Sequence, residues 1–371
     1  MNQEIKKRLI ECGYDYGFEC PPLTSDDEYP DYIKENVAEC IKKIKEVQNE
    51  NTFTFAFMTD LHYLPLAHHK VLLKRNTNAY SDIVRETDCN RLILGGDYVI
   101  DSPREQKLEG YKKLAEAFEP FGYLPCNGNH DSGSLWDRYM EYNKPVNKLR
   151  RSEIYDAFYK TLSQRGAVFN PKHKGLYYYF DDKENGVRYI FIDICDTPDN
   201  YEETLKVAHC LSQNQIDWLI NDALVTNYDI ILDTHSVLLP TITDEEEKSK
   251  NGNRRLEILN LILDSFKNRE KISGTFCEDE FMVKVNADFS KIACGNIIAV
   301  MVGHFHKDYT MYTKSGIPYI ATANFFMAEC HEPRNMGDKT ELLFDVVTVD
   351  RRKRTIYVTR IGSGEDRIIN Y

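Results

Sequence analysis

The chain has 371 residues, with 59 acidic and 47 basic side chains, and its formal net charge is −12 at pH 7. A chain of this length can bury a large core, in one domain or in two to three smaller ones. The negative charge repels polyanions and disfavours nucleic acid as the main partner. No apolar run is long enough to cross a membrane, and the first residues lack the apolar region of a secretory signal. The ten cysteines form no CxxC pair, so we expect reduced thiols in a cytoplasmic protein.

The first part of the chain, residues 1–52, is polar and is predicted to be a helical extension packed on the main domain. Within 31–47, apolar residues recur at intervals of three or four, which places them on one face of a helix. These apolar residues are Ile33, Val37, Ile41 and Ile44. The remainder, 53–371, is predicted to form a single domain.

The stretch TFTFAFMTDLH, at 52–62, is predicted to be the central strand of that domain. Its phenylalanines alternate with small or β-branched residues, and this period of two predicts a strand that runs into Asp60 and His62. A short apolar run at 91–94 predicts a second buried strand, and the amphipathic stretch 105–118 predicts a helix. This alternation of strands and helices predicts an α/β fold.

The second half of the chain continues the alternation. Asn185-Gly186 separates two strand-like runs and predicts a β-hairpin. The stretch 211–224 predicts a helix, with Ser212 as its N-terminal cap. The predicted strands of this half are 177–180, 187–194, 230–232, 297–302, 318–321, 342–349 and 355–361, the last two forming a terminal hairpin.

Two segments are predicted to be inserts within the domain. The segment near 132–170 is rich in Tyr, Trp and Arg, and it is predicted to be a helical pair that forms one wall of a cleft. The segment 241–292 is the least regular part of the chain, with an acidic run and a helix predicted at 254–266. Both inserts would narrow the entrance to a site.

Five short fragments of polar residues each follow an apolar, strand-like run. In α/β sheets, ligands bind just outside the carboxyl ends of the strands, so these fragments are expected to meet in one site. A single histidine is more often a surface or core residue, and only the combination of all five predicts a site. The fragments are Asp60-x-His62, Gly96-Asp97, Gly128-Asn129-His130-Asp131, His235 and Gly303-His304-x-His306.

The residue types in these fragments suit a pair of divalent metal ions. Imidazole and carboxylate favour Mn, Fe, Zn, Ni or Co, and no cysteine is placed for a thiolate-rich zinc site. His304 and His306 are two residues apart, so an extended backbone would point both to one side. Two divalent ions carry +4, and Asp60 and Asp97 supply −2. The surplus of +2 suits a phosphate group and a hydroxide.

In their order along the chain, these fragments resemble the D-x-H, GD, GNH[DE], His and GHxH pattern of the calcineurin-like metallophosphoesterase superfamily. The resemblance covers about residues 53–325. It implies a sandwich of two mixed β-sheets flanked by helices and a centre of two metal ions. The implied ligands are Asp60, His62 and His306 for one metal and Asn129, His235 and His304 for the other, with Asp97 bridging them.

The resemblance also implies the roles of the remaining residues. His130 would contact the phosphate and protonate the leaving oxygen, and Asp131 would orient the His130 ring. Two metals about 3.5–4 Å apart would lower the pKa of a bridging water, whose hydroxide would attack phosphorus in line with the leaving group. No phosphoenzyme is then required. The stretch 211–219 resembles a helix common in the phosphodiesterase and acid-phosphatase branches.

The chain departs from the family pattern after the GD fragment. Many members carry an aspartate three residues after the bridging one, and purple acid phosphatases carry a tyrosine ligand there. This chain has Ile100 at that position, followed by Asp101, whose role stays open. A tyrosinate–iron(III) centre is therefore not expected, and Tyr98 is expected to pack in the core.

The predicted function is hydrolysis of a phosphate ester, with a small-molecule phosphodiester favoured because the inserts would narrow the cleft. A phosphomonoesterase and a nuclease are the enzymatic alternatives. A nuclease would need a basic rim, for which the candidates are Arg138, Lys148, Arg150 and Arg151. A binding protein without turnover would lack one of the ligands, and none is missing. The physiological substrate, the native metal and the oligomeric state stay open.

Overall fold

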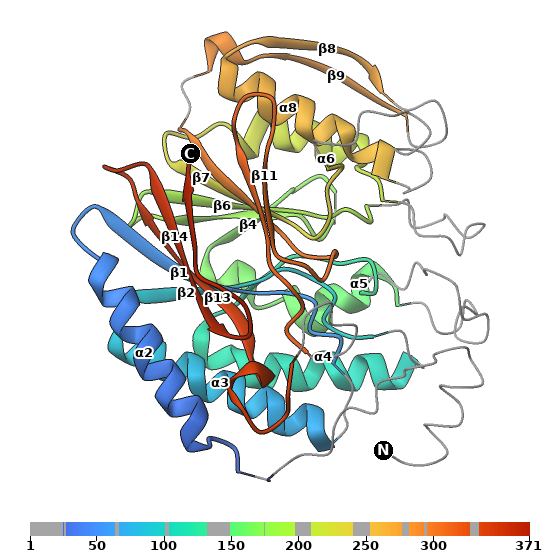
Figure 1. Ribbon diagram of the computed structural model, residues 1–371. Coiled ribbons are helices and arrows are strands. Elements are labelled where there is room, and N and C mark those ends of the chain that lie inside the picture. Colours follow the sequence, from blue (N-terminus) through green and yellow to red (C-terminus); the bar gives the residue numbers. More distant parts are fainter. Residues whose placement is uncertain are drawn as a thin grey trace.

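Two large mixed β-sheets lie at the centre of the molecule, with helices on their outer sides (Figure 1). Phe55 of one sheet meets Tyr189 of the other with ring centroids 5.8 Å apart, so the sheets share a buried apolar layer. The predicted sandwich of two mixed sheets flanked by helices is confirmed. The computed structural model describes residues 25, 27–63, 67–100, 104–131, 149–173, 175–196, 209–239, 253–276, 282–292, 295–326 and 334–371.

The six-stranded sheet has the order β15-β14-β13-β1-β2-β3. The strands β1, β2 and β3 are parallel, as expected for strands joined through helices, whereas β13, β14 and β15 run antiparallel to their neighbours. The bounds are β1 Thr52–Met58, β2 Cys89–Leu94, β3 Leu124–Pro125, β13 Leu343–Asp350, β14 Thr355–Gly362 and β15 Arg367–Asn370. The terminal hairpin is therefore confirmed, while β15 was not predicted.

The seven-stranded sheet has the order β11-β12-β10-β7-β6-β5-β4. Its four central strands, β12, β10, β7 and β6, are parallel. The hairpin predicted at Asn185-Gly186 joins β5 and β6, with Gly186 at φ 61°. The bounds are β4 Ala167–Phe169, β5 Tyr178–Asp182, β6 Val187–Ile192, β7 Asp229–Thr234, β10 Ile297–Val302, β11 Tyr309–Tyr312 and β12 Pro318–Ala321.

Figure 1 shows α2, α3 and α4 beside the six-stranded sheet, and α6 and α8 beside the seven-stranded sheet. The predicted helix at 31–47 is α2, whose buried face includes Ile33, Val37 and Ile44. Among the described helices, none is long and apolar enough to cross a membrane. The bounds are α2 Asp31–Val47, α3 Ala67–Glu86, α4 Arg104–Phe118, α5 Arg151–Ile154, α6 Gln213–Trp218 and α8 Glu257–Asn268.

Short 3₁₀ and π turns complete the helical part of the chain. The cap predicted at Ser212 is confirmed, because its side chain accepts the backbone N–H of Gln215. The predicted helix at 211–224 is α6 continued by a π turn. These turns are η1 Glu119–Phe121, η3 Tyr155–Tyr159, η4 Leu162–Arg165, η5 Leu219–Ala223, η6 Asn253–Leu256, η7 Phe289–Lys291 and η8 Lys339–Glu341.

The two predicted inserts differ from expectation. In the first, residues 132–148 lie outside the described part; the rest, from 149 onward, is the short helix α5, two helical turns and the edge strand β4. The second contains α8 as predicted, and also a separate two-stranded sheet of β8 Lys271–Phe276 and β9 Val283–Asp288. Both segments therefore contribute strands that their composition did not predict, because edge strands lack a continuous apolar pattern.

Candidate metal centre

The predicted ligands all lie just beyond the carboxyl ends of parallel strands. Asp60 and His62 follow β1, Asp97 follows β2, and Asn129 follows β3. His235 follows β7, and His304 and His306 follow β10. The first three strands belong to the six-stranded sheet and the other two to the seven-stranded sheet. The candidate site is thus assembled from both sheets, at the edge where α/β proteins bind ligands.

Five of these residues have left-handed backbone conformations. The φ angles are 54° at Asp60, 42° at His62, 52° at Asp97, 70° at His304 and 51° at His306. Few non-glycine residues adopt this region, and such conformations persist where the surrounding structure enforces them, often at functional sites. The positive φ at Asp60 also explains why β1 ends at Met58 and not at position 62.

The expectation of an extended backbone at His304 and His306 is wrong. Both residues are left-handed, and Phe305 N donates to Gly303 O at 2.8 Å, so the chain turns tightly here. Gly303 is required at this turn, because a Cβ on it would lie 2.1 Å from Thr59 Oγ1 and 2.7 Å from Asp60 Oδ2. The two imidazoles therefore diverge: His306 lies with Asp60 and His62, and His304 lies with Asp97 and His235.

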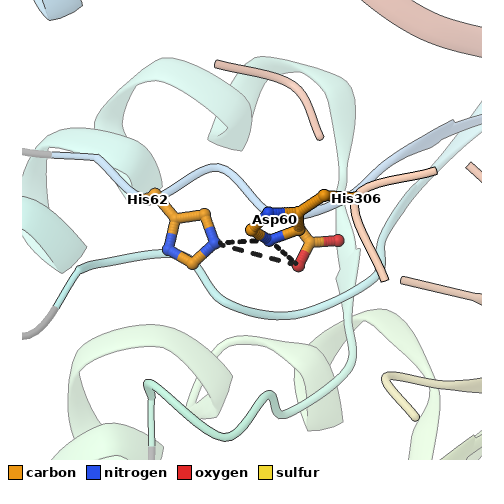
Figure 2. Close-up of side chains that lie close together, drawn as sticks. All are labelled: Asp60, His62 and His306. Carbon is orange, nitrogen blue, oxygen red and sulfur yellow. Dashed lines mark hydrogen bonds and ion pairs between the residues drawn. The ribbon is translucent and has the colours of Figure 1, made fainter. Parts of the chain in front are cut away.

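Figure 2 shows the first of these groups, in which the side chains of Asp60, His62 and His306 converge. The Nε2 atoms of His62 and His306 are 3.0 Å apart, and Asp60 Oδ1 lies 3.2 Å from His306 Nε2. His62 Nε2 is 3.9 Å from the same oxygen. Two imidazole nitrogens and one carboxylate oxygen thus face a common point, as ligands of one divalent ion do.

A second group is formed by Asp97, His235 and His304, whose ligand atoms lie within 4.8 Å of one another. His235 Nε2 is 3.0 Å from Asp97 Oδ2. On the other side of the ring, His235 Nδ1 lies 2.7 Å from Gly95 O, a contact that suits Nδ1–H as donor and leaves Nε2 directed at the site. Asp97 also belongs to a third group with His62 and His130, so it lies between the other two groups.

The protonation states of the site residues suit the binding of a cation. Burial lowers the pKa of His62 to about 3, which keeps its imidazole neutral and able to donate a lone pair. Burial opposes ionisation of Asp60, but His235 and His306 outweigh it and lower the pKa of this carboxyl to about 2. For His235, burial favours the neutral ring, but Asp97 and Asp60 raise its pKa to about 9. The carboxylates thus create a negative potential that attracts positive charge.

The donor set supports the same conclusion. In each group, imidazole nitrogens and a carboxylate oxygen from separate segments lie within 4.8 Å of one another. Divalent transition metals are bound by donors of these kinds. The residues present therefore fit a divalent metal. Asn129 is buried between Gly128 and His130, and its role as a ligand stays a prediction.

His130 lies at the edge of the site. Its side chain is 23% exposed, and its Nε2 is 3.9 Å from Asp97 Oδ2. The ring contacts that of His62 with centroids 5.0 Å apart. Its backbone N donates to Asp97 Oδ1 at 2.8 Å, which ties this residue to the carboxylate at the centre of the site. His130 can therefore be reached from solvent while it stays next to the predicted ligands.

Asp131 is bonded to the backbone of the loops that follow β2 and β3. Its buried carboxylate accepts hydrogen bonds from the backbone N of Asp97 at 2.8 Å, of Tyr98 at 2.8 Å and of Gly128 at 2.9 Å. The Tyr111 hydroxyl donates to it at 2.9 Å. These four donors hold the carboxylate. Asp131 therefore joins the loops after β2 and β3, and its expected role of orienting the His130 ring stays a prediction.

Two residues near the site have no motif that predicts them. Tyr111, on α4, anchors Asp131 as described above, and only its spacing on the buried face of a helix distinguishes it in the sequence. His209 is buried, and its ring lies against that of His304 with centroids 5.1 Å apart. It precedes Cys210, which forms an isolated β-bridge with Cys195 at the end of β6. This long-range pairing brings His209 to the site.

Around the position where the chain departs from the family pattern, the described residues Tyr98 and Ile100 are buried, as expected for Tyr98. Tyr98 packs in the core, with its ring 4.6 Å from that of Phe158 and its hydroxyl donating to Leu94 O. Ile100 is buried. Asp101 lies outside the described residues, as do Arg138 and Lys148 of the possible basic rim.

The fold and these clusters define a metal-dependent phosphoesterase. The family model of calcineurin-like phosphoesterases matches residues 53–308, which is more than half of the chain. The chain therefore belongs to the calcineurin-like phosphoesterase family, and metal-dependent hydrolysis of phosphoesters is the activity of its class. No curated protein matches the chain significantly.

The chain is similar to several solved structures at low sequence identity. A dimetal phosphatase from Danio rerio superposes with a TM-score of 0.55 at 12% identity, over 86% of this chain and 99% of that one. A Haemophilus influenzae NAD nucleotidase has a TM-score of 0.38 at 10% identity, over 86% of this chain and 49% of that one. A predicted phosphoesterase from Streptococcus pneumoniae has a TM-score of 0.29 at 10% identity, over 87% and 100%. Only the first similarity is strong enough to support the fold.

Proposed function

We propose that the protein hydrolyses a small-molecule phosphodiester with the help of two divalent transition-metal ions. One ion would be held by Asp60, His62 and His306, and the other by Asn129, His235 and His304, with Asp97 between them. The observation that carries the proposal is that Asp97 shares one group of converging ligand atoms with His235 and His304 and another with His62, which itself belongs to the group of Asp60 and His306. A carboxylate shared in this way suits two ions better than one.

When bound, such a pair of ions activates a water molecule as nucleophile and neutralises charge on the phosphoryl oxygens. The protein must then supply the proton that the leaving oxygen needs. His130 is suited to this role because it is part-exposed and its backbone N–H is bonded to Asp97 Oδ1. Asp131 supports it by fixing the loops that carry Asp97 and His130.

A small substrate is favoured over a nucleic acid by the charges. The chain carries a net charge of −12, and nucleic-acid binding requires a basic surface. Of the basic residues considered for a rim, Arg151 is only 11% exposed, and its Nη2 lies 3.2 Å from Asp196 Oδ1. It is thus engaged in an ion pair and is not available to a phosphate backbone.

The cytoplasm stays the proposed compartment, supported by the free thiols of Cys40, Cys89, Cys126, Cys195 and Cys210.

Reconstitution with Mn²⁺, followed by removal of unbound metal and elemental analysis, tests the metal part of the proposal. We expect two ions per chain. Less than one ion per chain would contradict the ligand set. Turnover of bis-nitrophenyl phosphate and of nitrophenyl phosphate by the loaded protein then compares diester with monoester.

A higher kcat/KM for the diester is expected. A preference for the monoester would replace the proposal by a phosphomonoesterase. Two bound ions without turnover of either ester would instead indicate a binding protein.

A further inference from the structure

We propose that Arg360, on β14 of the six-stranded sheet, is a positioning residue for the loop that carries His304 and His306. The inference rests on the proposed metal centre, and it assigns a role to a part of the chain that lies beyond the family match at 53–308.

The loop at 303–308 holds a conformation that it would not adopt alone. His304 and His306 both have positive φ, at 70° and 51°, a conformation that non-glycine residues keep only where the surroundings enforce it. The start of the loop is held by His304 N, which donates to Asp60 Oδ2 at 2.9 Å, and by Gly303 N, which donates to His235 O at 3.1 Å. The end of the loop needs a second restraint.

Asp308 supplies the attachment point for that restraint. Its Oδ1 accepts Arg360 Nη2–H at 2.7 Å and Ala323 N–H at 2.9 Å. Arg360 is 3% exposed, so this contact lies in the protein interior, where water does not weaken it. Asp308 follows His306 by two residues, and its position therefore limits where the His306 backbone can lie.

Arg360 is itself held rigidly. Its Nε donates to Asp345 Oδ1 at 2.7 Å, and its Nη1 donates to Ser363 O at 2.8 Å. Asp345 is buried and also accepts Arg367 Nη2 at 2.5 Å and Thr322 Oγ1 at 2.6 Å. Three nitrogens of one planar guanidinium thus face three acceptors, an arrangement that a lysine ammonium does not reproduce.

The consequence concerns the alignment of the two sheets. Asp60 and His62 come from the six-stranded sheet, whereas His306 comes from the seven-stranded sheet. A metal site requires its ligands to be placed within about 0.5 Å. Arg360 belongs to the same sheet as Asp60 and His62 and fixes the loop of His306. It therefore fixes the position of His306 relative to Asp60 and His62.

Arg367 offers a matched control. It pairs with the same carboxylate, Asp345, and donates to Ala321 O at 2.7 Å, and its contacts do not include Asp308 among the described residues. Replacing either arginine by methionine removes one buried partner of Asp345. Only Arg360→Met removes the contact with Asp308 in the loop at 303–308.

The experiment measures Mn²⁺ affinity by equilibrium dialysis on the full chain, together with thermal unfolding in EDTA. We expect Arg360→Met to weaken Mn²⁺ binding by roughly 10–100-fold, the usual effect of a group that orients a ligand, and Arg360→Lys to restore little of it. Arg367→Met should lower the unfolding temperature but leave the affinity unchanged. Asp308→Asn, which keeps a group able to accept the Ala323 N–H, should weaken binding less than Arg360→Met.

Equal loss of affinity in Arg360→Met and Arg367→Met would overturn the inference, since it would show a general effect of stability. Unchanged affinity in Arg360→Lys and Asp308→Asn would also overturn it, and these two variants serve if Arg360→Met does not fold. Wild-type protein that fails to bind Mn²⁺ would overturn the proposed function and this inference with it. Wild-type binding with unaffected variants would overturn this inference alone.

Discussion

Two clusters of buried charge lie close together in this protein, and they differ in how their charges are compensated. In the cluster of Asp308, Asp345, Arg360 and Arg367, both carboxylates face guanidinium groups at 2.5–2.7 Å. In the candidate metal centre, Asp60 and Asp97 face imidazoles, and burial keeps at least the His62 ring neutral. The first cluster is neutralised within the chain, and the second leaves negative charge for a cation. Internal compensation thus separates a structural cluster of buried charges from one that binds an ion.

Removing the shared carboxylate should have the largest effect. Asp97→Asn should abolish turnover and lower the metal content, because this residue belongs to two of the ligand groups and its charge attracts the ions. Elemental analysis after Mn²⁺ loading and the kcat for a chromogenic diester measure the two effects. Asp229→Asn is the control, since it removes one carboxylate from a part-exposed pair with Arg351. Full metal content in Asp97→Asn would show that Asp97 is not a ligand.

The next effect concerns the proton donor. His130→Ala should retain the metal and slow catalysis by roughly 10²–10⁴-fold, the usual contribution of one general acid. The loss in kcat/KM should be much larger on alkyl esters than on nitrophenyl esters, because only a poor leaving group needs the proton. Equal losses on both esters would assign His130 to positioning of the phosphate. Loss of the metal would make it a ligand.

The smallest expected effect concerns the stability contributed by the cluster of Asp308, Asp345, Arg360 and Arg367. Burial opposes ionisation of Asp345, but Arg360 and Arg367 lower its pKa below the usual value. A carboxyl with a depressed folded pKa stabilises the protein above its unfolded pKa of about 4, and this contribution is lost as the pH falls through the folded pKa. At pH 7, Asp345→Asn should therefore reduce the free energy of unfolding by about 3–5 kcal/mol, as expected for a broken buried pair.

Urea unfolding in EDTA at several pH values measures this difference between Asp345→Asn and wild type. It should be constant between pH 5 and 8 and should shrink below about pH 4. Asp31→Asn, whose carboxylate is 88% exposed, serves as the control and should change stability little. A difference that grows on acidification would mean that the Asp345 pKa is raised in the folded protein.

The sequence predicted most of the framework, because strands and helices follow from local patterns. The alternating phenylalanines of 52–62, the hairpin signal Asn185-Gly186 and the apolar face of 31–47 each specify an element without reference to the rest of the chain. The same holds for the candidate site residues, because each follows an apolar strand and the ends of parallel strands meet at one edge of a sheet. Short or edge strands carry little periodic signal, and the sequence did not predict the strands β4, β8, β9, β11 and β15.

Tertiary structure decided the conformations and partners within the site. The left-handed backbone at His304 and His306 is not a local preference, and distant residues support it: His304 N donates to Asp60 Oδ2 and Gly303 N donates to His235 O. Asp131 bonds to backbone groups more than thirty residues away, and Arg360 reaches Asp308 across 52 residues. Such contacts depend on how the two sheets are placed against each other. That placement results from packing of the whole core, which no short stretch of sequence encodes.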